Sequence, residues 1–414
     1  MTISLCMIVK DEATTLGRTL ESAEAVVDEI IVVDTGSTDD TMAIAQAHGA
    51  KVHAIGWSQD FAAARNASLR YATGDWVLVL DADEVLQPEA AQALRRLDQG
   101  QPLGDIPAQA ILAVTLFRLE VGAPQAPYTL ITRFFRRQPE ISFSRPYHET
   151  VDDSIAALQA QAPHWQVVSL ADVALHHTGY APEVVAQRGK FDRARTIMEQ
   201  YLAQHPDDGY LLNKLAALYI EADNPVAALP LLDRALAQPE SVLDPITRYE
   251  LHYHRALAQR QTNLDQASQD YKAALTQPVP PMLKLGAWVN FGSLQKAQGE
   301  LLDAIELFQQ AIAVAPNLAV AHFNLGAAQR ARGYLDEAIA AYRQAIALQP
   351  DYPEAHQNLG VALFKLGRLP EALQSFRQAV QLYDHADPAY AASLRQGIRG
   401  LGIPPAMLAQ AHLA

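Results

Sequence analysis

A spacing of 34 residues recurs through the C-terminal part of this 414-residue chain. Glycine recurs at this spacing, each time followed by a second glycine seven residues later, at Gly292 and Gly299, Gly326 and Gly333, and Gly360 and Gly367. Alanine and an aromatic residue recur with the same period, at Ala304 and Phe308, Ala338 and Tyr342, and Ala372 and Phe376. This period predicts a stack of similar units, each of which buries its apolar face against its neighbours.

The period and its order of residues resemble tetratricopeptide (TPR) repeats, whose units are pairs of helices. The small residues would let paired helices approach closely, and the aromatic residues would fill the space between neighbours. Weaker copies extend upstream, with small residues at Ala194, Ala228 and Ala267. We therefore expect an all-α solenoid of about five repeats plus a starting helix over residues 181–385, and a capping helix over residues 386–414. Its groove would hold a protein or peptide; the alternative is a packing or dimerisation module.

The first 100 residues alternate between strand and helix patterns. Runs typical of buried strands are separated by stretches with helical spacing, and the strand runs occupy residues 2–9, 29–34, 51–55 and 76–80. This order predicts a mostly parallel sheet with helices on both faces, which binds ligands beyond the carboxyl ends of its strands. Further β-type runs continue the sheet, the first two as an antiparallel extension, at residues 110–120, 128–137, 141–143 and 165–175.

The fourth strand run ends in Asp81-Ala82-Asp83. Side chains alternate along an extended segment, so Asp81 and Asp83 can point the same way. Two adjacent carboxylates repel each other unless a cation lies between them, and hard oxygen ligands suit Mg²⁺ or Mn²⁺, which in turn would hold phosphates. Asp34 ends the second strand run, so two carboxylate sites converge on one edge of the sheet. The alternative is an acidic turn that ends a strand.

Composition excludes several other classes of function. The formal net charge is −14, which argues against non-specific nucleic-acid binding and against a polybasic membrane anchor. Cys6 is the only cysteine, so we expect neither disulfides nor a cysteine-based zinc site. No run of about 18 apolar residues and no secretory signal is visible, so we expect no transmembrane segment. The sequence thus predicts a cytoplasmic protein, with peripheral attachment at the inner membrane as the alternative.

Four stretches of the N-terminal region carry a family resemblance: SLCMIVKDE at residues 4–12, VVDTGSTD at 32–39, DFAAARN at 60–66 and GDWVLVLDADE at 74–84. In this order they resemble the family 2 glycosyltransferases, which have a GT-A fold. Arg133-Phe134-Phe135-Arg136 and His148-Glu149 make the bacterial lipopolysaccharide-core β-glucosyltransferases the most similar subgroup. The resemblance implies an α/β domain of GT-A type, with a Rossmann-like and mostly parallel sheet, over residues 1–180.

The resemblance also implies a nucleotide-diphospho sugar as the donor, with a UDP-sugar as the first expectation. Asp34 would accept hydrogen bonds from the base or ribose, Glu12 would help to line the base pocket, and Asp81 would contact the ribose or a metal-bound water. Arg65 would grip phosphate oxygens, as a guanidinium does in bidentate pairs. The alternatives are helix capping for Glu12 and a surface salt bridge for Arg65.

Asp83 would contact Mn²⁺ or Mg²⁺ directly, and the metal would stabilise the negative charge that builds on the leaving nucleotide. GT-A enzymes often complete the metal shell with a later histidine, so His177 and His148 are the candidates for a further ligand. The alternative for each is an ordinary structural histidine.

Family 2 enzymes generally invert the anomeric centre by direct displacement, which needs one general base. We choose Glu149 for this role, and Glu120 and Asp152 stay open. The sequence therefore predicts an inverting, metal-dependent glycosyltransferase whose acceptor is a saccharide, a lipid-linked glycan or a protein, with the repeats recruiting the acceptor or a partner. The competing hypothesis is an interaction scaffold whose transferase-like domain has lost activity.

Overall fold

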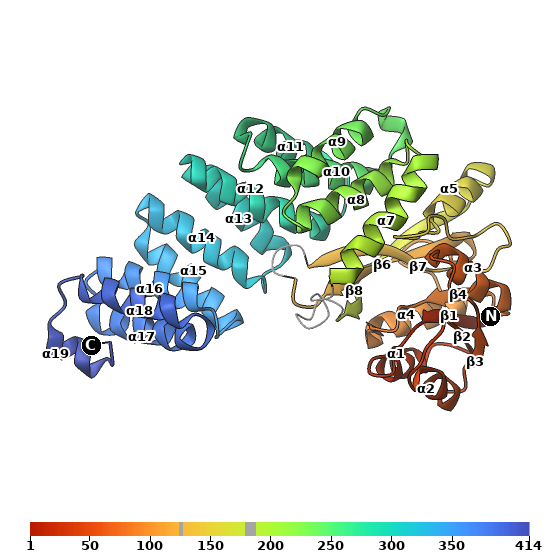
Figure 1. The fold of residues 1–414 in the computed structure, drawn as a ribbon, viewed down its shortest axis with the longest axis horizontal. Helices are drawn as coiled ribbons and strands as arrows, with labels where there is room; N and C mark the ends of the chain where they lie inside the picture. Colours follow the sequence, from red (N-terminus) through yellow and green to blue (C-terminus); the bar gives the residue numbers. More distant parts are fainter. Residues whose placement is uncertain (124–126, 179–187, 414) are drawn as a thin grey trace. The chain divides into compact units, whose positions relative to one another are not determined.

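The computed structural model of the chain describes residues 1–123, 127–178 and 188–413 (Figure 1). They form two compact units. The N-terminal unit comprises the described residues from Met1 to Thr247, and the C-terminal unit begins at Arg248. The predicted domain boundary between residues 180 and 181 lies outside the described residues. The N-terminal unit therefore contains both the sheet and the first helices after it.

The described strands form one eight-stranded sheet, in the order β3-β2-β1-β4-β7-β6-β8-β5. The strands are β1 (Ile3–Val9), β2 (Glu29–Asp34), β3 (Lys51–Ala54), β4 (Trp76–Val79), β5 (Glu84–Leu86), β6 (Ile111–Glu120), β7 (Tyr128–Arg136) and β8 (Gln166–His177). β1 to β4 are parallel, and β7 is antiparallel to both β4 and β6. The predicted parallel sheet with an antiparallel extension is thus confirmed.

Helices cover both faces of this sheet, because side chains alternate between the faces. In β1, Leu5 and Met7 belong to the core that α1 and α4 cover, whereas Cys6 belongs to the core beneath α3 and α5. The helices around the sheet are α1 (Leu16–Ala23), α2 (Thr41–Ala47), α3 (Phe61–Tyr71), α4 (Pro88–Asp98) and α5 (Asp152–Gln161), with a 3₁₀ turn at Ala108–Ala110.

One predicted strand is wrong. Residues 141–143 form no strand, and the neighbouring pairing is a single bridge between Ser144 and Thr150. Ile141 and Phe143 are buried in the core beneath α3 and α5, so their apolar character reflects packing of a loop. The sequence did not predict β5 and α5.

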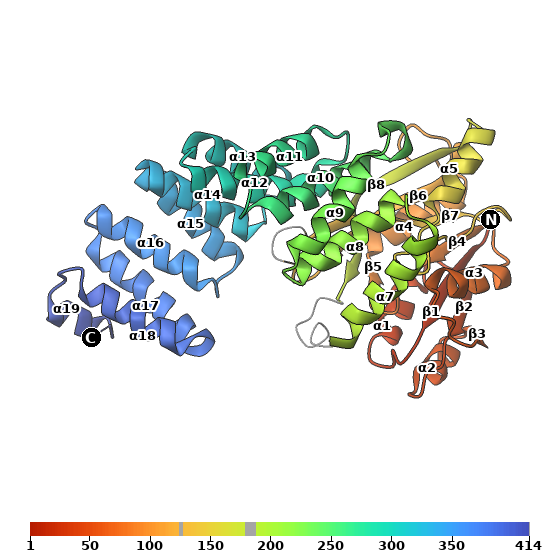
Figure 2. The ribbon, with the colours of Figure 1, turned by 45° about the horizontal axis from the view of Figure 1, so that its top comes forward.

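The rest of the described chain is helical, which confirms the all-α region after the sheet (Figure 2). Its helices are α7 (Arg188–Gln204), α8 (Gly209–Glu221), α9 (Pro225–Leu236), α10 (Pro245–Gln259), α11 (Leu264–Thr276), α12 (Leu285–Gln298), α13 (Leu301–Val314), α14 (Ala319–Arg332), α15 (Leu335–Leu348), α16 (Pro353–Lys365), α17 (Leu369–Ala386), α18 (Pro388–Arg399) and α19 (Pro405–Gln410). Short 3₁₀ helices occupy Glu240–Val242 and Pro281–Lys284. No helix in the described part of the chain is long and apolar enough to cross a membrane.

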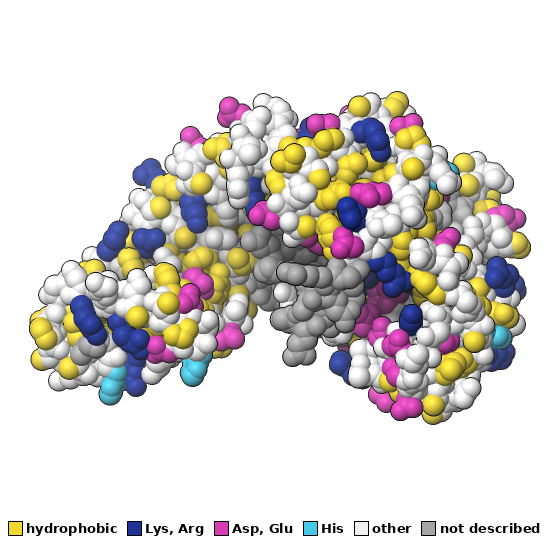
Figure 3. Space-filling view, in the orientation of Figure 1, with side chains coloured by type: hydrophobic (Ala, Val, Ile, Leu, Met, Phe, Trp, Pro, Cys, Tyr) yellow, Lys and Arg dark blue, Asp and Glu magenta, His cyan; other side chains and the backbone are white. Residues whose placement is uncertain are grey.

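Acidic side chains gather on part of the surface of the N-terminal unit (Figure 3). Around α1 and α4, Glu21, Glu24 and Glu89 are exposed. A surface of this sign repels the phosphates of nucleic acids.

The repeat glycines lie where two helices touch. A Cβ added to Gly326 of α14 would come within 2.9 Å of the Tyr342 ring in α15, and the matching distance is 2.7 Å from Gly292 to Phe308. Separations this short leave no room for a methyl group. Glycine therefore recurs every 34 residues because it lies at the contact between paired helices.

Gly326→Ala is expected to destabilise the chain by about 1–2 kcal/mol, because overpacking costs about 1–3 kcal/mol and the gain in helix propensity returns less than about 1 kcal/mol. Gly397→Ala is the control, since a Cβ at Gly397 of α18 would meet no atom within 4 Å. Thermal unfolding of the full chain measures both. Equal shifts of the unfolding midpoint in the two variants would contradict this packing role.

Candidate active site

The carboxyl ends of β1, β2 and β4 meet at one edge of the sheet, because these strands are parallel neighbours. The strand order reverses between β1 and β4, and a crevice for ligands opens at such a reversal. Asp34 is the last residue of β2, and Asp81 and Asp83 follow β4. The structure therefore places both carboxylate sites on the same edge.

Asp34 and Glu12 organise two loops at this edge. Asp34 is 2% exposed, and its Oδ2 accepts hydrogen bonds from the backbone N–H groups of Gly36 (2.9 Å) and Ser37 (3.0 Å). Gly36 has a φ of +108°, which favours glycine. Oε2 of Glu12 accepts a hydrogen bond of 2.7 Å from the Thr15 hydroxyl, just before α1. Both carboxylates therefore shape the loops at this edge of the sheet.

Asp81 is held by arginines from three elements. Arg65 of α3 forms an ion pair with its Oδ1, Arg133 of β7 donates to its Oδ2 at 2.8 Å, and Nη1 of Arg118 in β6 lies 3.9 Å from Oδ2. Burial alone would raise the pKa of Asp81, but the three guanidinium groups outweigh it and hold the pKa well below its usual range. Asp81 is therefore ionised, and it gathers positive charge at the carboxyl edge.

Arg65 is buried, with 3% of its surface exposed, so the alternative of a surface salt bridge is wrong. Its Nε donates to Oε1 of Glu149 at 2.6 Å, and its Nη2 pairs with Asp81. Its buried Nη1 makes no hydrogen bond to any residue that the structure describes. Burial alone would lower the pKa of Arg65, but the two carboxylates outweigh it and raise the pKa. The guanidinium thus stays charged and keeps one unused donor nitrogen.

Arg118 was not among the predicted site residues. Its Nη1 lies 2.9 Å from Oε1 of Glu84, and its Nη2 lies 2.7 Å from Oε1 of Glu120. Glu84 is completely buried and its Oε2 accepts a hydrogen bond from the Asp81 backbone N–H at 2.9 Å. An arginine inside the mostly apolar run of β6 was the available signal, because a buried charge requires a partner.

His177 links Asp83 to Glu120. Its Nε2 lies 3.1 Å from Oδ2 of Asp83, and its Nδ1 lies 2.5 Å from Oε2 of Glu120. Burial alone would lower the pKa of His177, but the two carboxylates outweigh it and raise the pKa to about 10. Of the two candidate histidines, His177 is the one that the structure brings to Asp83. His148 lies in the loop before Glu149, and its ring centroid is 5.0 Å from that of Tyr147.

Asp83 and His177 could hold a metal that takes its remaining ligands from substrate, provided that the metal displaces the proton that the raised pKa keeps on Nε2 of His177. Adjacent ligands of an octahedral ion with bonds of about 2.1 Å lie about 3 Å apart, close to the 3.1 Å between these two donor atoms. A metal-binding histidine commonly has its other ring nitrogen bonded to a carboxylate, as Glu120 provides here. Across residues 1–123, 127–178 and 188–413 no group of three or more His, Cys, Asp or Glu is placed to hold a metal. Mg²⁺ is often bound by one or two protein ligands together with substrate phosphates.

The three carboxylates considered for the general base lie in different surroundings. The Glu149 side chain is 11% exposed and its Oε1 is bonded to Arg65. The Glu120 side chain is 4% exposed and is held by Arg118 and His177, so it is closed to an acceptor. Asp152 is exposed at the start of α5, where it accepts a hydrogen bond of 2.5 Å from the Thr150 hydroxyl.

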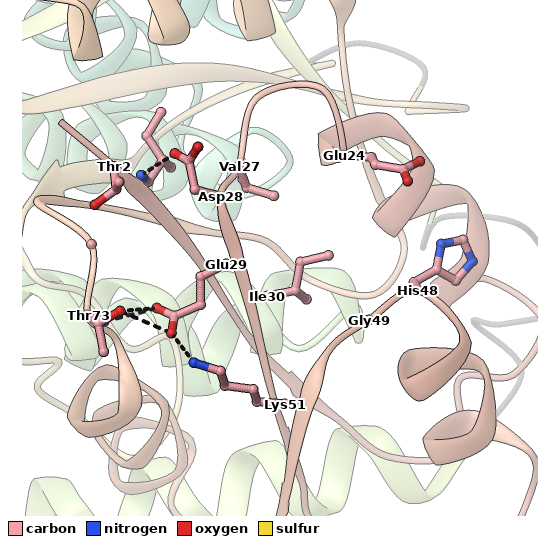
Figure 4. A pocket seen from close by; sticks show the side chains of 12 residues that line it. Thr2, Glu24, Val27, Asp28, Glu29, Ile30, His48, Gly49, Lys51 and Thr73 are labelled. Carbon is pink, nitrogen blue, oxygen red and sulfur yellow. Dashed lines mark hydrogen bonds and ion pairs between the residues drawn. The ribbon is translucent and has the colours of Figure 1, made fainter.

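A separate pocket of about 440 Å³ lies at the amino ends of the parallel strands (Figure 4). Glu29, the first residue of β2, forms a 2.7 Å ion pair there with Lys51. Burial alone would raise the pKa of Glu29, but hydrogen bonds from Lys51, Ser4 and Thr73 outweigh it and lower the pKa to about 2. These polar groups satisfy one another, and the pocket lies at the opposite ends of the strands from Asp34 and Asp81.

The mostly parallel sheet and the acidic and arginine-rich carboxyl edge fit a glycosyltransferase domain of the GT-A type. Residues 4–164 match the family described as Glycosyl transferase family 2, and TPR families match residues 185–241, 285–318, 328–367 and 353–386. Residues 4–164 therefore form a family 2 glycosyltransferase domain, which this chain joins to TPR repeats. Its resemblance to the lipopolysaccharide-core subgroup stays a prediction.

Several known proteins are similar to this chain. A TPR repeat-containing protein of Synechococcus elongatus is 46% identical over 316 residues, which are 76% of each chain. An uncharacterized glycosyltransferase of Rickettsia felis is 28% identical over 202 residues, 48% of this chain and 71% of its own. Among solved structures, the TPR protein YrrB superposes with a TM-score of 0.41 at 18% identity, covering 50% of this chain and 100% of its own.

Proposed function

We propose that the chain transfers a sugar from a nucleotide-diphospho sugar to an acceptor hydroxyl, with inversion at the anomeric carbon. The observation that carries this proposal is the pair of Asp83 Oδ2 and His177 Nε2, 3.1 Å apart, beside an Asp81 that is surrounded by arginines. Oxygen and nitrogen donors at this spacing suit Mn²⁺ or Mg²⁺, and the adjacent guanidinium groups suit a diphosphate.

The donor would lie across the carboxyl edge of the sheet. Asp34 and Glu12 hold the loops around the base and ribose, and a UDP-sugar is the first candidate. Arg65 offers Nη1 to the diphosphate, since this nitrogen has no partner among the described residues and a buried guanidinium N–H in that state gains most from an anionic oxygen. A divalent ion held by Asp83 and His177 would supply charge stabilisation for the leaving nucleoside diphosphate.

Glu149 is the proposed general base for the acceptor hydroxyl. Direct displacement breaks the bond between the anomeric carbon and the diphosphate as the acceptor oxygen bonds to that carbon, and the acceptor's proton passes to a base. Arg65 already holds Oε1 of Glu149, so Oε2 is the oxygen that would receive the proton. Asp152 is the alternative base, since it is exposed.

For the acceptor we propose three chemical classes. A saccharide, a lipid-linked glycan and a protein all offer a hydroxyl group, and the TPR groove would recruit a protein acceptor or a partner. Reaction in the cytoplasm, including at the inner face of a membrane, would give access to all three.

A screen of nucleotide sugars tests the proposal. With Mn²⁺ present, one donor is expected to be hydrolysed or transferred at a rate that falls to background when a chelator removes the metal, because the diphosphate needs the ion for charge stabilisation. Product nucleotide is measured for each donor, and calorimetry measures binding of UDP and GDP. If no nucleotide binds in a Mn²⁺-dependent manner, the proposed donor chemistry is refuted.

A further inference from the structure

The loop that carries Glu149 has a strained backbone. Residues 144–150, here called the 144–150 loop, are closed by a bridge in which the Ser144 N–H donates to the Thr150 carbonyl at 2.9 Å. Within it, Arg145 has a φ of +71° and His148 has a φ of +53°, in the left-handed region that favours glycine. Such residues persist only when their surroundings hold them, and they cluster at functional sites.

The start of α8 provides one such hold. Nε of Arg145 donates to Oδ2 of Asp208 at 2.8 Å, and each of these side chains is 10% exposed. The Arg145 guanidinium also lies over the Tyr210 ring, 4.7 Å from its centroid. Asp208 is at the same time the N-cap of α8, because its Oδ1 accepts a hydrogen bond from the Leu211 N–H at 2.9 Å. A largely buried ion pair thus joins the first repeat helices to the loop.

Helix α7 provides a second hold. The guanidinium of Arg193 lies over Trp57 and Phe61, 4.9 and 5.8 Å from their ring centroids. Phe61 in turn donates its backbone N–H to the Pro146 carbonyl at 3.0 Å and packs edge-on against Tyr147, at 5.4 Å between centroids. Both contacts of Phe61 fall inside the 144–150 loop.

The loop delivers Glu149 to the site. Oε1 of Glu149 accepts from Nε of Arg65, and Arg65 pairs with Asp81. Two ion pairs therefore link Glu149 through Arg65 to the carboxyl edge of the sheet, and a third ties Arg145, in the same loop, to the N-cap of α8. Each arginine in this series is bound by more than one carboxylate, which fixes its orientation.

We propose that Arg145 and Asp208 are positioning residues for sugar transfer, and that the first repeat helices are a working part of the catalytic unit. This inference rests on the proposed function, in which Glu149 acts at the acceptor hydroxyl. Without the hold from α8, the 144–150 loop relaxes from its strained conformation and Glu149 moves away from Arg65.

Asp208→Asn separates the two roles of Asp208, its ion pair with Arg145 and its capping of α8. Asparagine caps a helix as well as aspartate does, so α8 keeps its cap while the charge opposite Arg145 is lost. We expect kcat to fall about 10-fold to 100-fold with little change in the donor KM, because a displacement of about 1 Å at the reacting groups can cost about 100-fold. Hydrogen exchange in the 144–150 loop should become faster. The unfolding midpoint should fall less than in a variant that leaves Arg145 unpaired, because Asp153 still binds its guanidinium.

Asp387→Asn is the matched control. Asp387 caps α18 in the same manner, accepting from the Tyr390 N–H at 3.0 Å, and α18 belongs to the C-terminal unit. This variant should keep the wild-type kcat and loop exchange. Arg145→Lys is a second test, because lysine keeps the charge but cannot bind Asp208 and Asp153 together, so its kcat should fall less than that of Asp208→Asn.

Two results would overturn the inference: a wild-type kcat in Asp208→Asn, or a lower kcat without faster exchange in the 144–150 loop. The exchange measurement needs no substrate. A wild-type protein without turnover would therefore refute the proposed transfer, while unchanged loop exchange in Asp208→Asn would still refute the hold by α8.

Discussion

Asp83→Ala is expected to remove Mn²⁺-dependent donor binding and to lower transfer by about 10³-fold, because a metal that stabilises developing charge contributes several kcal/mol to the transition state. Asp83 supplies one of the two protein donors, at 3.1 Å from Nε2 of His177, so its loss leaves a single ligand. The Asp83 side chain is 29% exposed, so the fold should survive the change. Calorimetry with the nucleotide and Mn²⁺ measures binding, and turnover of the donor measures the rate.

Asp40→Ala is the control for this change. Asp40 follows β2 near the same edge of the sheet and is exposed, and its side chain makes no capping hydrogen bond to α2. Asp40→Ala should therefore leave the metal dependence of donor binding and turnover unchanged. Metal-dependent turnover at the wild-type rate in Asp83→Ala would show that Asp83 is not a metal ligand.

The parallel strands could be predicted because their information is local. β1, β2 and β4 are buried on both faces and appear in the sequence as continuous apolar runs, such as EIIVVD in β2. The repeats could be predicted equally well, since Gly326 and its counterparts occur at a fixed period where paired helices touch. These segments required no knowledge of distant partners.

The missed elements depend on distant partners. β5 has three residues and pairs with Leu175, His176 and His177 of β8, so its extended form comes from a strand far along the chain. α5 buries Ile155 alone among its ten residues, and a helix with a single buried residue shows no apolar period. Residues 141 and 143 belong to a loop and pack beneath α3 and α5. Their alternating apolar pattern is the same as that of a short strand, so the sequence alone could not tell the two apart.

Only part of the site could be predicted, because some of its contacts also depend on residues far apart in the sequence. Asp81 and Asp83 are adjacent to the strand that presents them, so a motif of three residues located them. Arg118 lies on β6 and Arg133 on β7. Both come close to Asp81 because β7 pairs with β4, which Asp81 follows, and also with β6. This pairing joins segments that are far apart in the sequence. Glu149 and Arg65 are 84 residues apart, so their 2.6 Å contact was likewise beyond the reach of local patterns.

Arg65→Met is expected to destabilise the N-terminal unit by about 3–5 kcal/mol, because removing one partner of a buried ion pair leaves the other charge uncompensated. Arg65 is 4% exposed in its side chain and binds both Glu149, which is 11% exposed, and Asp81. Asp81 keeps Arg133 at 2.8 Å, so most of the cost should fall on Glu149. Chemical denaturation of the full chain measures the free energy of unfolding.

A double-mutant cycle separates loss of packing from loss of charge pairing. If the uncompensated Glu149 carboxylate causes the damage, adding Glu149→Gln to Arg65→Met should recover about 1–3 kcal/mol relative to the sum of the single changes. Arg368→Met is the control for an exposed pair, since Arg368 and Glu371 are 38% and 43% exposed, and its unfolding should match that of the wild type. Strict additivity in the cycle would mean that Arg65 stabilises the fold by packing against Phe143, whose ring centroid is 5.6 Å from its guanidinium carbon, and that its ion pair with Glu149 contributes nothing to stability.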